Sequence, residues 1–287
     1  MIAFVVLHYL TLSDTVEAVN YIKNNVGCTD YVIIIVDNAS PNESGQKLLE
    51  KYKNEDKISV NIQKENLGFA NGNNVGFVIA KNKYHAEFIV MMNNDVNLVS
   101  LDFSGKIKSI YQRRPFAVLG PLILTADGRC DSNPVAKNYR NIEEIKKSIE
   151  RYKKRLRWLQ SGLEPIRLYA SSLKKKKYIE ERKKDFLDEQ ENVRLHGSCW
   201  IFSPQYIEKY NGIDSGTFMY MEEDILQYHM KNDKMIMLYS PEIVVFHKEA
   251  VSTSANITDK QKLLRKYNWL IESNEYFLKL MQRGERE

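Results

Sequence analysis

Residues 87–98 read EFIVMMNNDVNL, and this stretch sets the expectation for how the first half of the chain folds. The apolar run from Phe88 to Met92 has the length of a buried strand, and it stops at three polar residues, Asn93, Asn94 and Asp95. A plain turn needs only one such residue. The excess of polar side chains where a buried strand ends indicates a binding site.

Three comparable strand patterns precede this stretch. They read IAFVVLHY (2–9), YVIIIVDN (31–38) and KISVNIQ (57–63). Helical patterns lie between them, one from about Asp14 to Asn25 and another in NGNNVGFVIAKN (71–82). Parallel neighbouring strands need crossover helices, so this order predicts an α/β fold with a mostly parallel, doubly wound central sheet flanked by helices.

Polar residues collect at the carboxyl ends of all four predicted strands, where sheets of this kind bind their ligands. A single polar strand end is a loop, whereas four adjacent ones predict a site. The candidates, in chain order, are His8, Tyr9, Asp37, Asn38, Ser40, Asn66, Gly68, Phe69, Asn73, Asn74, Asn93, Asn94 and Asp95.

Size and composition favour an ordinary globular protein. The chain has 287 residues, 43% of them hydrophobic, and no run approaches the roughly 20 apolar residues of a membrane-spanning helix. The opening MIAFVVLHYL lacks a basic start and a cleavage site, so we expect a cytoplasmic protein. Cys28, Cys130 and Cys199 lie far apart and are expected to be reduced structural thiols.

The positive charge is concentrated in one segment. The formal net charge is +5, yet residues 137–184 contain 17 Lys and Arg against 6 Glu, so the remainder is acidic. An apolar stripe at spacings of three and four runs from Ile142 to Leu159 and predicts an amphipathic helix in a basic helical insertion. A solvated insertion packed on the domain and attachment to an anionic membrane surface, with Trp158 in the interface, both remain open. Nucleic-acid binding is disfavoured, because no recognition motif accompanies the charge.

The glycine pattern excludes two common nucleotide sites. Gly68, Gly72 and Gly76 fit neither GxGxxG nor GxxxxGK[ST]. Asp37 can bind a nucleobase or ribose, although a simple turn is the alternative. Asp95 suits Mg²⁺ or Mn²⁺, which often take one or two carboxylates and complete their coordination with substrate phosphates and water.

The motifs VDNAS (36–40), NLGFANGNN (66–74) and MNNDV (92–96), in this order, resemble the family 2 inverting glycosyltransferases with the GT-A fold, especially the bacterial rhamnosyltransferase-like branch. The resemblance continues through HGSCWIFSP (196–204), GTFMYMEEDIL (216–226) and FHKEAVS (246–252), and covers about 1–110 and 193–280. It implies one domain over 1–287. Its parts would be a nucleotide-sugar half (1–115), an acceptor and catalytic half (116–136 and 193–257), the basic insertion (137–192) and a carboxyl-terminal helix (258–287).

The resemblance also implies roles for individual residues. Asp37 would contact the base or ribose, and Asn66 with the stretch 68–74 would border the nucleotide and sugar. Asp95 stands where the family's DXD metal motif ends, while Asn93 replaces its first acidic residue and leaves the metal fewer charged ligands. His247 would complete the metal shell or touch the diphosphate, with Ser252 nearby.

The general base is expected in the run Glu222, Glu223, Asp224. Counting from Tyr220 places the catalytic position on Glu223, whereas matching the Glu-Asp pair places it on Asp224, which we favour. A helical wheel puts Met221, Ile225, Tyr228 and His229 in a buried stripe with Glu223 pointing away. Acceptor contacts are expected from Glu222, His196, Gly197, Ser198 and Trp200, although Trp200 suits the core equally well.

The expected reaction is sugar transfer, with inversion, from a nucleotide-diphospho-sugar, dTDP-rhamnose or a UDP-hexose, to a glycan or lipid-linked glycan acceptor in bacterial surface polysaccharide assembly. The enzyme would be cytoplasmic or peripheral at the inner face of the plasma membrane. A sugar-phosphate nucleotidyltransferase is one alternative, but LHYLTLSD (7–14) has no Gly-rich, Arg- or Lys-bearing loop. The other is a non-catalytic glycan- or membrane-binding protein.

Overall fold

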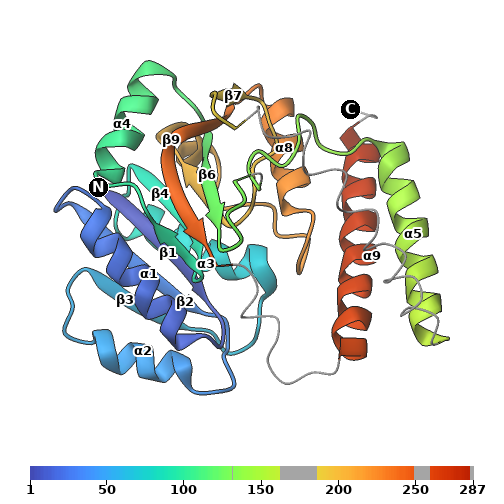
Figure 1. Ribbon diagram of the computed structural model, residues 1–287, viewed down its shortest axis with the longest axis horizontal. Coiled ribbons are helices and arrows are strands. Elements are labelled where there is room, and N and C mark those ends of the chain that lie inside the picture. The colour runs from blue at the N-terminus through green and yellow to red at the C-terminus, as the bar shows by residue number, and fades with distance from the viewer. Residues whose placement is uncertain (131, 162–185, 249–258, 285–287) are drawn as a thin grey trace.

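The computed structural model describes residues 1–130, 132–161, 186–248 and 259–284 (Figure 1). Within these residues, nine strands form one sheet with helices packed around it. Two long helices, α5 (Ile142–Gln160) and α9 (Asp259–Gly284), lie side by side at one end of the molecule, apart from the sheet.

The first half folds as the sequence predicts. Strands β1 (Ile2–His8), β2 (Tyr31–Asp37), β3 (Ile58–Ile62) and β4 (Phe88–Asn93) are parallel, in the order β3-β2-β1-β4. Helices α1 (Leu12–Asn25), α2 (Ser44–Tyr52) and α3 (Gly68–Asn82) connect them. All four carboxyl ends therefore lie at one edge of the sheet, the edge where the polar residues collect.

The core lies on both faces of this parallel region. Along β1, Phe4 and Val6 pack into one buried apolar cluster, while Ala3 and Val5 pack into another on the opposite face. Because successive side chains of a strand point to opposite faces, a continuous apolar run such as FVV is what two-sided burial requires.

The second half of the sheet is mixed. Strands β8 (Cys199–Phe202), β6 (Val118–Thr125), β9 (Met237–His247) and β5 (Val96–Leu98) follow β4 in that order. Strands β6 and β9 are parallel, whereas β8 is antiparallel to both β4 and β6. Antiparallel pairs β5–β9 and β7 (Gln190–Glu191)–β9 complete the sheet among the described residues. The mostly parallel arrangement thus holds for the amino-terminal part.

The runs MIMLYS (235–240) and IVVFHK (243–248) predict two short strands where the structure has the single strand β9. Its pairing with β6 shifts register after Ser240, and Pro241 falls in the irregular part. Proline lacks a backbone N–H and is tolerated in a sheet at such irregularities. It therefore interrupts the ladder without ending the strand, and β9 continues to His247 at the site.

Helices complete the second half. Helix α4 (Phe103–Arg113) precedes β6, and α7 (Pro204–Lys209) and α8 (Glu222–Asn232) follow β8. The predicted amphipathic helix is confirmed as α5, which starts with a capping box of Asn141 and Glu144 and buries Ile145 and Ile149 against α9. The sequence also predicts a second charged helical stretch at about 173–190. Most of this stretch, and Ser252, lie outside the described residues.

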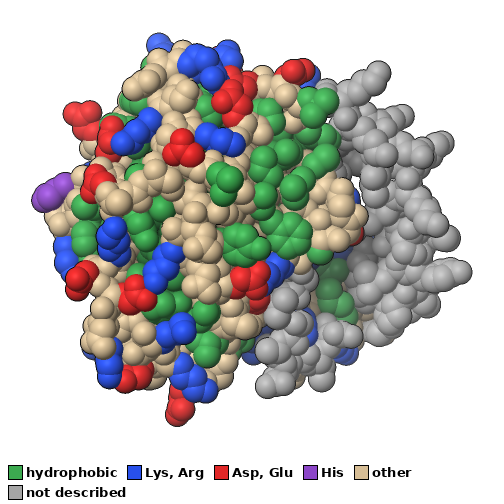
Figure 2. Space-filling view, turned by 60° about the vertical axis from the view of Figure 1, so that its left-hand side comes forward, with side chains coloured by type: hydrophobic (Ala, Val, Ile, Leu, Met, Phe, Trp, Pro, Cys, Tyr) green, Lys and Arg blue, Asp and Glu red, His purple; other side chains and the backbone are tan. Residues whose placement is uncertain are grey.

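Charge on the visible face of the main domain is mixed, since Lys and Arg side chains lie interspersed with Asp and Glu (Figure 2). Among the described residues, no helix combines the length and the apolar character needed to cross a membrane.

Candidate active site

Asp37 ends β2, and Ser40 follows it in a tightly held loop. Asp37 is 2% exposed, and its carboxylate accepts a hydrogen bond from the Ser40 backbone N–H at 3.3 Å. The Ser40 hydroxyl in turn accepts from the Leu10 N–H after β1 at 2.9 Å. A Cβ at Gly45 would lie 2.2 Å from the Asp37 carboxylate, so glycine is needed there to leave room for Asp37.

His8 does not face a ligand as predicted. Its ring is fully buried and shares hydrogen bonds with the hydroxyls of Thr15 (2.6 Å) and Ser44 (2.7 Å). Burial lowers the pKa of His8 and outweighs the opposing effect of Asp37, 3.9 Å away. A neutral histidine therefore joins β1 to α1 and α2 beneath the site, while Tyr9 beside it is partly exposed.

Asn38 shapes the loop between β3 and α3. Its side-chain amide donates to the Asn66 side chain (3.1 Å) and the Gly68 carbonyl (2.9 Å), and it accepts from the Leu67 N–H (2.8 Å). Gly68 has φ +79°, and a Cβ there would lie 2.3 Å from the Phe218 carbonyl oxygen. The loop can therefore lie against Phe218, which precedes α8 (Glu222–Asn232).

Two asparagines of α3 have structural roles that the sequence did not predict. Asn74 donates to and accepts from the backbone of Ile213, both at 2.8 Å, and so fixes the loop before α8. Asn73 is 1% exposed and donates to the Phe69 carbonyl within the helix. Phe69 itself is partly buried and packs edge-on against Trp200.

The end of β4 brings Asp95 beside His247. The Asp95 carboxylate lies 3.4 Å from Nε2 of His247, the last residue of β9, because β5 pairs with that end of β9. Both residues are buried, at 7% and 8% exposure. Asn93 is partly exposed beside them, whereas the Asn94 amide turns away and donates to the hydroxyls of Thr11 and Thr15.

The loop before β8 connects this pair to the acidic helix. The His196 ring packs edge-on against the His247 ring with centroids 5.8 Å apart. The next residue, Gly197, donates its backbone N–H to the Glu223 carboxylate at 3.2 Å. The Ser198 carbonyl accepts from the Asn93 N–H at 3.0 Å, which ties the loop to β4.

Trp200 is a core residue, so the predicted contact with an acceptor sugar is wrong in this conformation. Its side chain is fully buried in β8, packed between Phe69 and Phe202. Ser198 is also buried, at 1% exposure, while His196 and Gly197 are partly exposed. His196 and Gly197 are therefore the members of this group that a substrate can reach.

The three adjacent carboxylates at the start of α8 have three different environments. Glu222 is 7% exposed and accepts from the Thr217 hydroxyl at 3.0 Å. Burial, with a contribution from Glu223, raises the pKa of Glu222 to about 7. Glu223 is partly exposed and faces Gly197, as the wheel predicts from its position off the buried stripe.

Asp224, which the sequence favours as the base, is committed to ion pairs. It is 2% exposed and binds Arg140 at 3.0 Å and Arg194 at 2.5 Å. Burial raises the pKa of Asp224, but the hydrogen bonds and charge of Arg140 and the charge of Arg194 outweigh it and leave the pKa below its ordinary value. Such a carboxylate is a weak and inaccessible base.

Sequence reasoning did not find Arg140, Arg194, Asn133 or Thr217. Arg140 was counted with the basic insertion, and nothing in the sequence distinguishes it from the lysines around it. Asn133 is fully buried and joins the His196 N–H to the Pro121 carbonyl. These contacts connect residues remote in sequence, so no local pattern reports them.

The residues fit a divalent cation in part. A carboxylate oxygen and an imidazole nitrogen 3.4 Å apart can bind one ion, since such bonds are about 2.1 Å long. Within the described ranges, no cluster of three or more His, Cys, Asp or Glu side chains is arranged to hold a metal. The donor's diphosphate would have to supply the remaining ligands.

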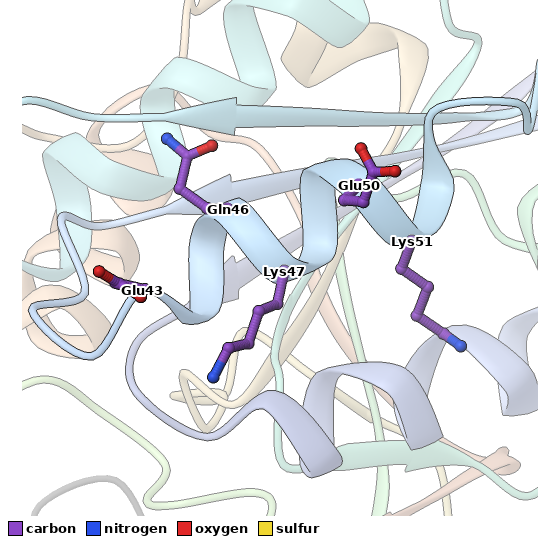
Figure 3. Close-up of a pocket in the computed structure, with 5 residues that line it drawn as sticks. All are labelled: Glu43, Gln46, Lys47, Glu50 and Lys51. Carbon is purple, nitrogen blue, oxygen red and sulfur yellow. The ribbon is translucent and has the colours of Figure 1, made fainter.

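A shallow surface hollow lies away from these residues. It runs along the exposed side of α2, and its lining side chains all come from that helix and the residue before it (Figure 3). None of them is buried, and acidic and basic groups alternate. They are Glu43, Gln46, Lys47, Glu50 and Lys51. The hollow contains no residue of the strand-end site.

The family model for glycosyl transferase family 2 matches residues 4–210, which is more than half of the chain. The chain therefore belongs to this glycosyltransferase family. A curated relative, the low-salt glycan biosynthesis hexosyltransferase Agl10 of Haloferax volcanii, is 21% identical over 253 residues, which span 87% of this chain and 69% of that protein.

Solved structures agree on the fold. TarS of S. aureus (residues 1–349) superposes with a TM-score of 0.53 at 12% identity, over 93% of this chain and 70% of that one. GalNAc-T7, solved with UDP, GalNAc and Mn²⁺, gives a TM-score of 0.60 at 13% identity, over 95% of this chain and 48% of that one. The fold is thus the GT-A fold of these glycosyltransferases; the rhamnosyltransferase-like branch is not specifically supported.

Proposed function

We propose that this chain is an inverting glycosyltransferase that binds a nucleotide-diphospho-sugar at the ends of β1 to β4 and uses Glu223 as its general base. One observation carries the proposal. Glu223 is joined through Gly197 and His196 to the His247–Asp95 pair, so an accessible carboxylate stands close to a carboxylate and imidazole suited to a metal-bound diphosphate.

We expect the residues of the donor site to have two roles, contact with the nucleotide and support of the residues that make this contact. Asp37 and the loop held by Asn38 form a preorganised wall for the nucleobase and ribose, with Tyr9 and Asn66 exposed at its edge. His8, Asn73, Asn74 and Asn94 support that wall from behind. Hydrogen-bonding groups that the fold already holds in place lose little conformational entropy when a ligand binds.

Asp95 and His247 would hold Mg²⁺ or Mn²⁺, which neutralises the charge that develops on the departing diphosphate. Asp95 is the only acidic residue in the run Asn93-Asn94-Asp95, because Asn93 replaces the first acidic residue of the family's metal motif. We therefore expect the protein alone to bind the cation weakly and the nucleotide to strengthen that binding.

Glu223 replaces Asp224 as the proposed base. Direct displacement requires a carboxylate that takes the acceptor hydroxyl proton as the new bond forms on the face opposite the leaving group. Glu223 is accessible and makes a single long hydrogen bond to Gly197, whereas both oxygens of Asp224 are bound by arginines.

The relatives favour a UDP-hexose over dTDP-rhamnose as the donor. Agl10 is named a hexosyltransferase, and TarS has been solved with UDP and with UDP-GlcNAc. Agl10 is also named for glycan biosynthesis, so a glycan or lipid-linked glycan in surface polysaccharide assembly is the proposed acceptor class. Family membership argues against the nucleotidyltransferase alternative.

The experiment has a binding arm and a turnover arm. The binding arm measures thermal stabilisation by UDP or dTDP with Mn²⁺, with Mg²⁺ and with EDTA. We expect stabilisation by UDP that EDTA or Asp95→Ala weakens. The turnover arm measures nucleoside diphosphate release from UDP-glucose, UDP-galactose, UDP-GlcNAc and dTDP-rhamnose. We expect Glu223→Gln to lower it by about 10²- to 10⁴-fold while UDP stabilisation persists.

Glu272→Gln, an exposed change on α9, is the control and should match the wild type in both arms. If neither nucleotide stabilised the wild type with either metal, the donor site would be wrong. If Glu223→Gln released nucleoside diphosphate at the wild-type rate, the base would be wrong. Binding without any turnover would support the non-catalytic alternative.

An anionic membrane surface is proposed as a further partner. From Lys146 onward, α5 carries seven Lys and Arg against one Glu, and several of them, including Lys147, Lys154 and Arg157, are exposed. Trp158 is partly exposed beneath Lys154, whose ammonium lies 4.9 Å from the ring centroid. Basic and aromatic groups on one helix face suit attachment at a lipid interface, where a lipid-linked acceptor would lie.

A further inference from the structure

The two residues that lead into α8 adopt a backbone conformation that residues other than glycine do not favour. Tyr220 and Met221 have φ of +75° and +77°, and neither is glycine. Met221 occupies the N-cap position and offers no side-chain hydrogen bond to the helix. Residues in such conformations persist only where the surroundings hold them, so contacts beyond the helix must fix this turn.

Asp224 and its arginine partners supply part of these contacts. Its carboxylate accepts hydrogen bonds from the Arg140 backbone N–H at 2.9 Å, from the Arg140 guanidinium at 3.0 Å and from the Arg194 guanidinium at 2.5 Å. The Arg140 guanidinium also contacts the sulfur of Met221. A buried carboxylate thereby joins α8 to two separate backbone segments.

Both arginines come from segments that are themselves fixed. The Arg194 backbone N–H and carbonyl bond to Ala136 and Val135, each at 2.7 Å. Arg140 directly precedes Asn141, which caps α5. Three residues after Arg194 comes Gly197, the group that donates to Glu223. The position of Glu223 relative to Gly197 therefore depends on how α8 is held against the segment that carries Arg194.

We propose that Asp224 is a positioning residue, which holds the first turn of α8 through Arg140 and Arg194 so that the Glu223 carboxylate stands beside Gly197. This inference rests on the proposed function, in which Glu223 is the base. Asp224 touches no substrate and takes no proton; it acts through the two arginines. Small displacements of a catalytic group are costly, about 100-fold in rate for roughly 1 Å.

The test compares Asp224→Asn and Arg194→Lys with Glu223→Gln. Turnover is measured with the nucleotide sugar that the wild type hydrolyses fastest, and kcat is normalised to the number of UDP-binding sites found by calorimetry with Mn²⁺. Normalisation removes any loss that comes only from misfolded protein. We expect Asp224→Asn to lower the normalised kcat by about 100-fold while KM for the donor and the UDP affinity stay unchanged. Arg194→Lys should lower kcat less, since it keeps the charge but loses the fork geometry.

A double variant tests whether Asp224 acts through Arg194. If Asp224 acts through Arg194, the double change Asp224→Asn with Arg194→Gln should cost little more than Asp224→Asn alone, because residues in one network are not additive. The matched control is Asp233→Asn, which removes an ion pair with Lys209 at the other end of the same helix. It should leave kcat unchanged.

Two results would overturn the inference. One is wild-type kcat in Asp224→Asn. The other is a combined outcome, in which Asp224→Asn is as inactive as Glu223→Gln while Arg194→Lys stays fully active. That outcome would make Asp224 the base itself. Full activity in Glu223→Gln is a different failure, since it would reject the proposed base and not the role of the ion pairs.

Discussion

At the scale of the residue, sequence neighbours in this chain have unlike chemistry. Glu222, Glu223 and Asp224 are adjacent, and mutual repulsion is what the sequence leads one to expect. The structure separates them: Glu222 is buried beside Thr217, Asp224 is paired with two arginines, and Glu223 is accessible. Their partners are remote in sequence, and those partners decide which carboxylate can act as a base.

Glu222→Gln is predicted to stabilise the protein at alkaline pH. The pKa of Glu222 rises from 4.5 to about 7 on folding, so the folded state holds the proton that the unfolded state releases. Stability therefore falls as pH rises from about 4.5 to 7, by on the order of 3 kcal/mol in total. Above pH 7 the variant avoids this cost, whereas near pH 4 it gains nothing.

Urea unfolding at pH 4.5 and pH 8 measures this effect, with Glu272→Gln as an exposed control. The difference in unfolding free energy between Glu222→Gln and the wild type should grow from pH 4.5 to pH 8, and the control should show no such change. A constant difference at both pH values would contradict the shifted pKa.

At the scale of the element, α3 depends on glycine for its approach to the sheet. A Cβ at Gly76 would lie 2.3 Å from the Val5 side chain and 3.1 Å from the Val36 side chain. At Gly72 it would lie 2.8 Å from Leu7. Gly72 and Gly76 thus allow close packing of the helix on β1 and β2.

Gly76→Ala is predicted to destabilise the fold, although alanine is the better helix former by about 1 kcal/mol. Overpacking a tight core position costs about 1–3 kcal/mol, and the contact with Val5 is too short to relax easily. Val78→Ala, on the exposed side of the same helix, should change stability by less than about 0.5 kcal/mol. Chemical denaturation distinguishes the two, and equal stability of both variants would show that α3 can shift to admit the methyl group.

At the scale of the whole molecule, the basic surface of α5 and the proposed catalytic groups lie in different parts of the structure. The exposed basic side of α5 belongs to the α5–α9 pair, while the site lies at the strand ends of the sheet. Arg140 connects them, since it binds Asp224 of α8 and directly precedes α5. A membrane bound to α5 would thus lie on an element fixed to the catalytic helix.

Vesicle sedimentation tests the membrane partner. The wild type is expected to bind vesicles containing phosphatidylglycerol, with salt weakening the binding, and to ignore pure phosphatidylcholine. Each basic residue near the surface contributes about 1 kcal/mol, so combined Lys147→Glu, Lys154→Glu and Arg157→Glu should lower affinity by more than about tenfold. The same charge change on α2 and its C-cap residue, Lys47→Glu, Lys51→Glu and Lys53→Glu, should have little effect. Equal losses of vesicle affinity in both variants would show that the attraction depends only on net charge. That result would reject a specific binding surface on α5.

The sequence by itself determined the parallel half of the sheet and the edge where the site lies. Strand-length apolar runs and the polar residues that end them are local patterns, and the carboxyl ends of parallel strands must share one edge. The amphipathic period of α5 is equally local, as is the position of Glu223 off the buried stripe of α8.

Only the tertiary structure decided what each polar side chain does. His8, Asn74, Asn94 and Asp224 look like ligand-binding or catalytic residues in the sequence, and each proves to be occupied by protein partners. The pairing of Asp95 with His247 depends on β5 and β9, which are about 150 residues apart in the chain. Burial and hydrogen-bond partners arise from such long-range contacts, and these fix the protonation and accessibility of a group more strongly than its neighbours in sequence do.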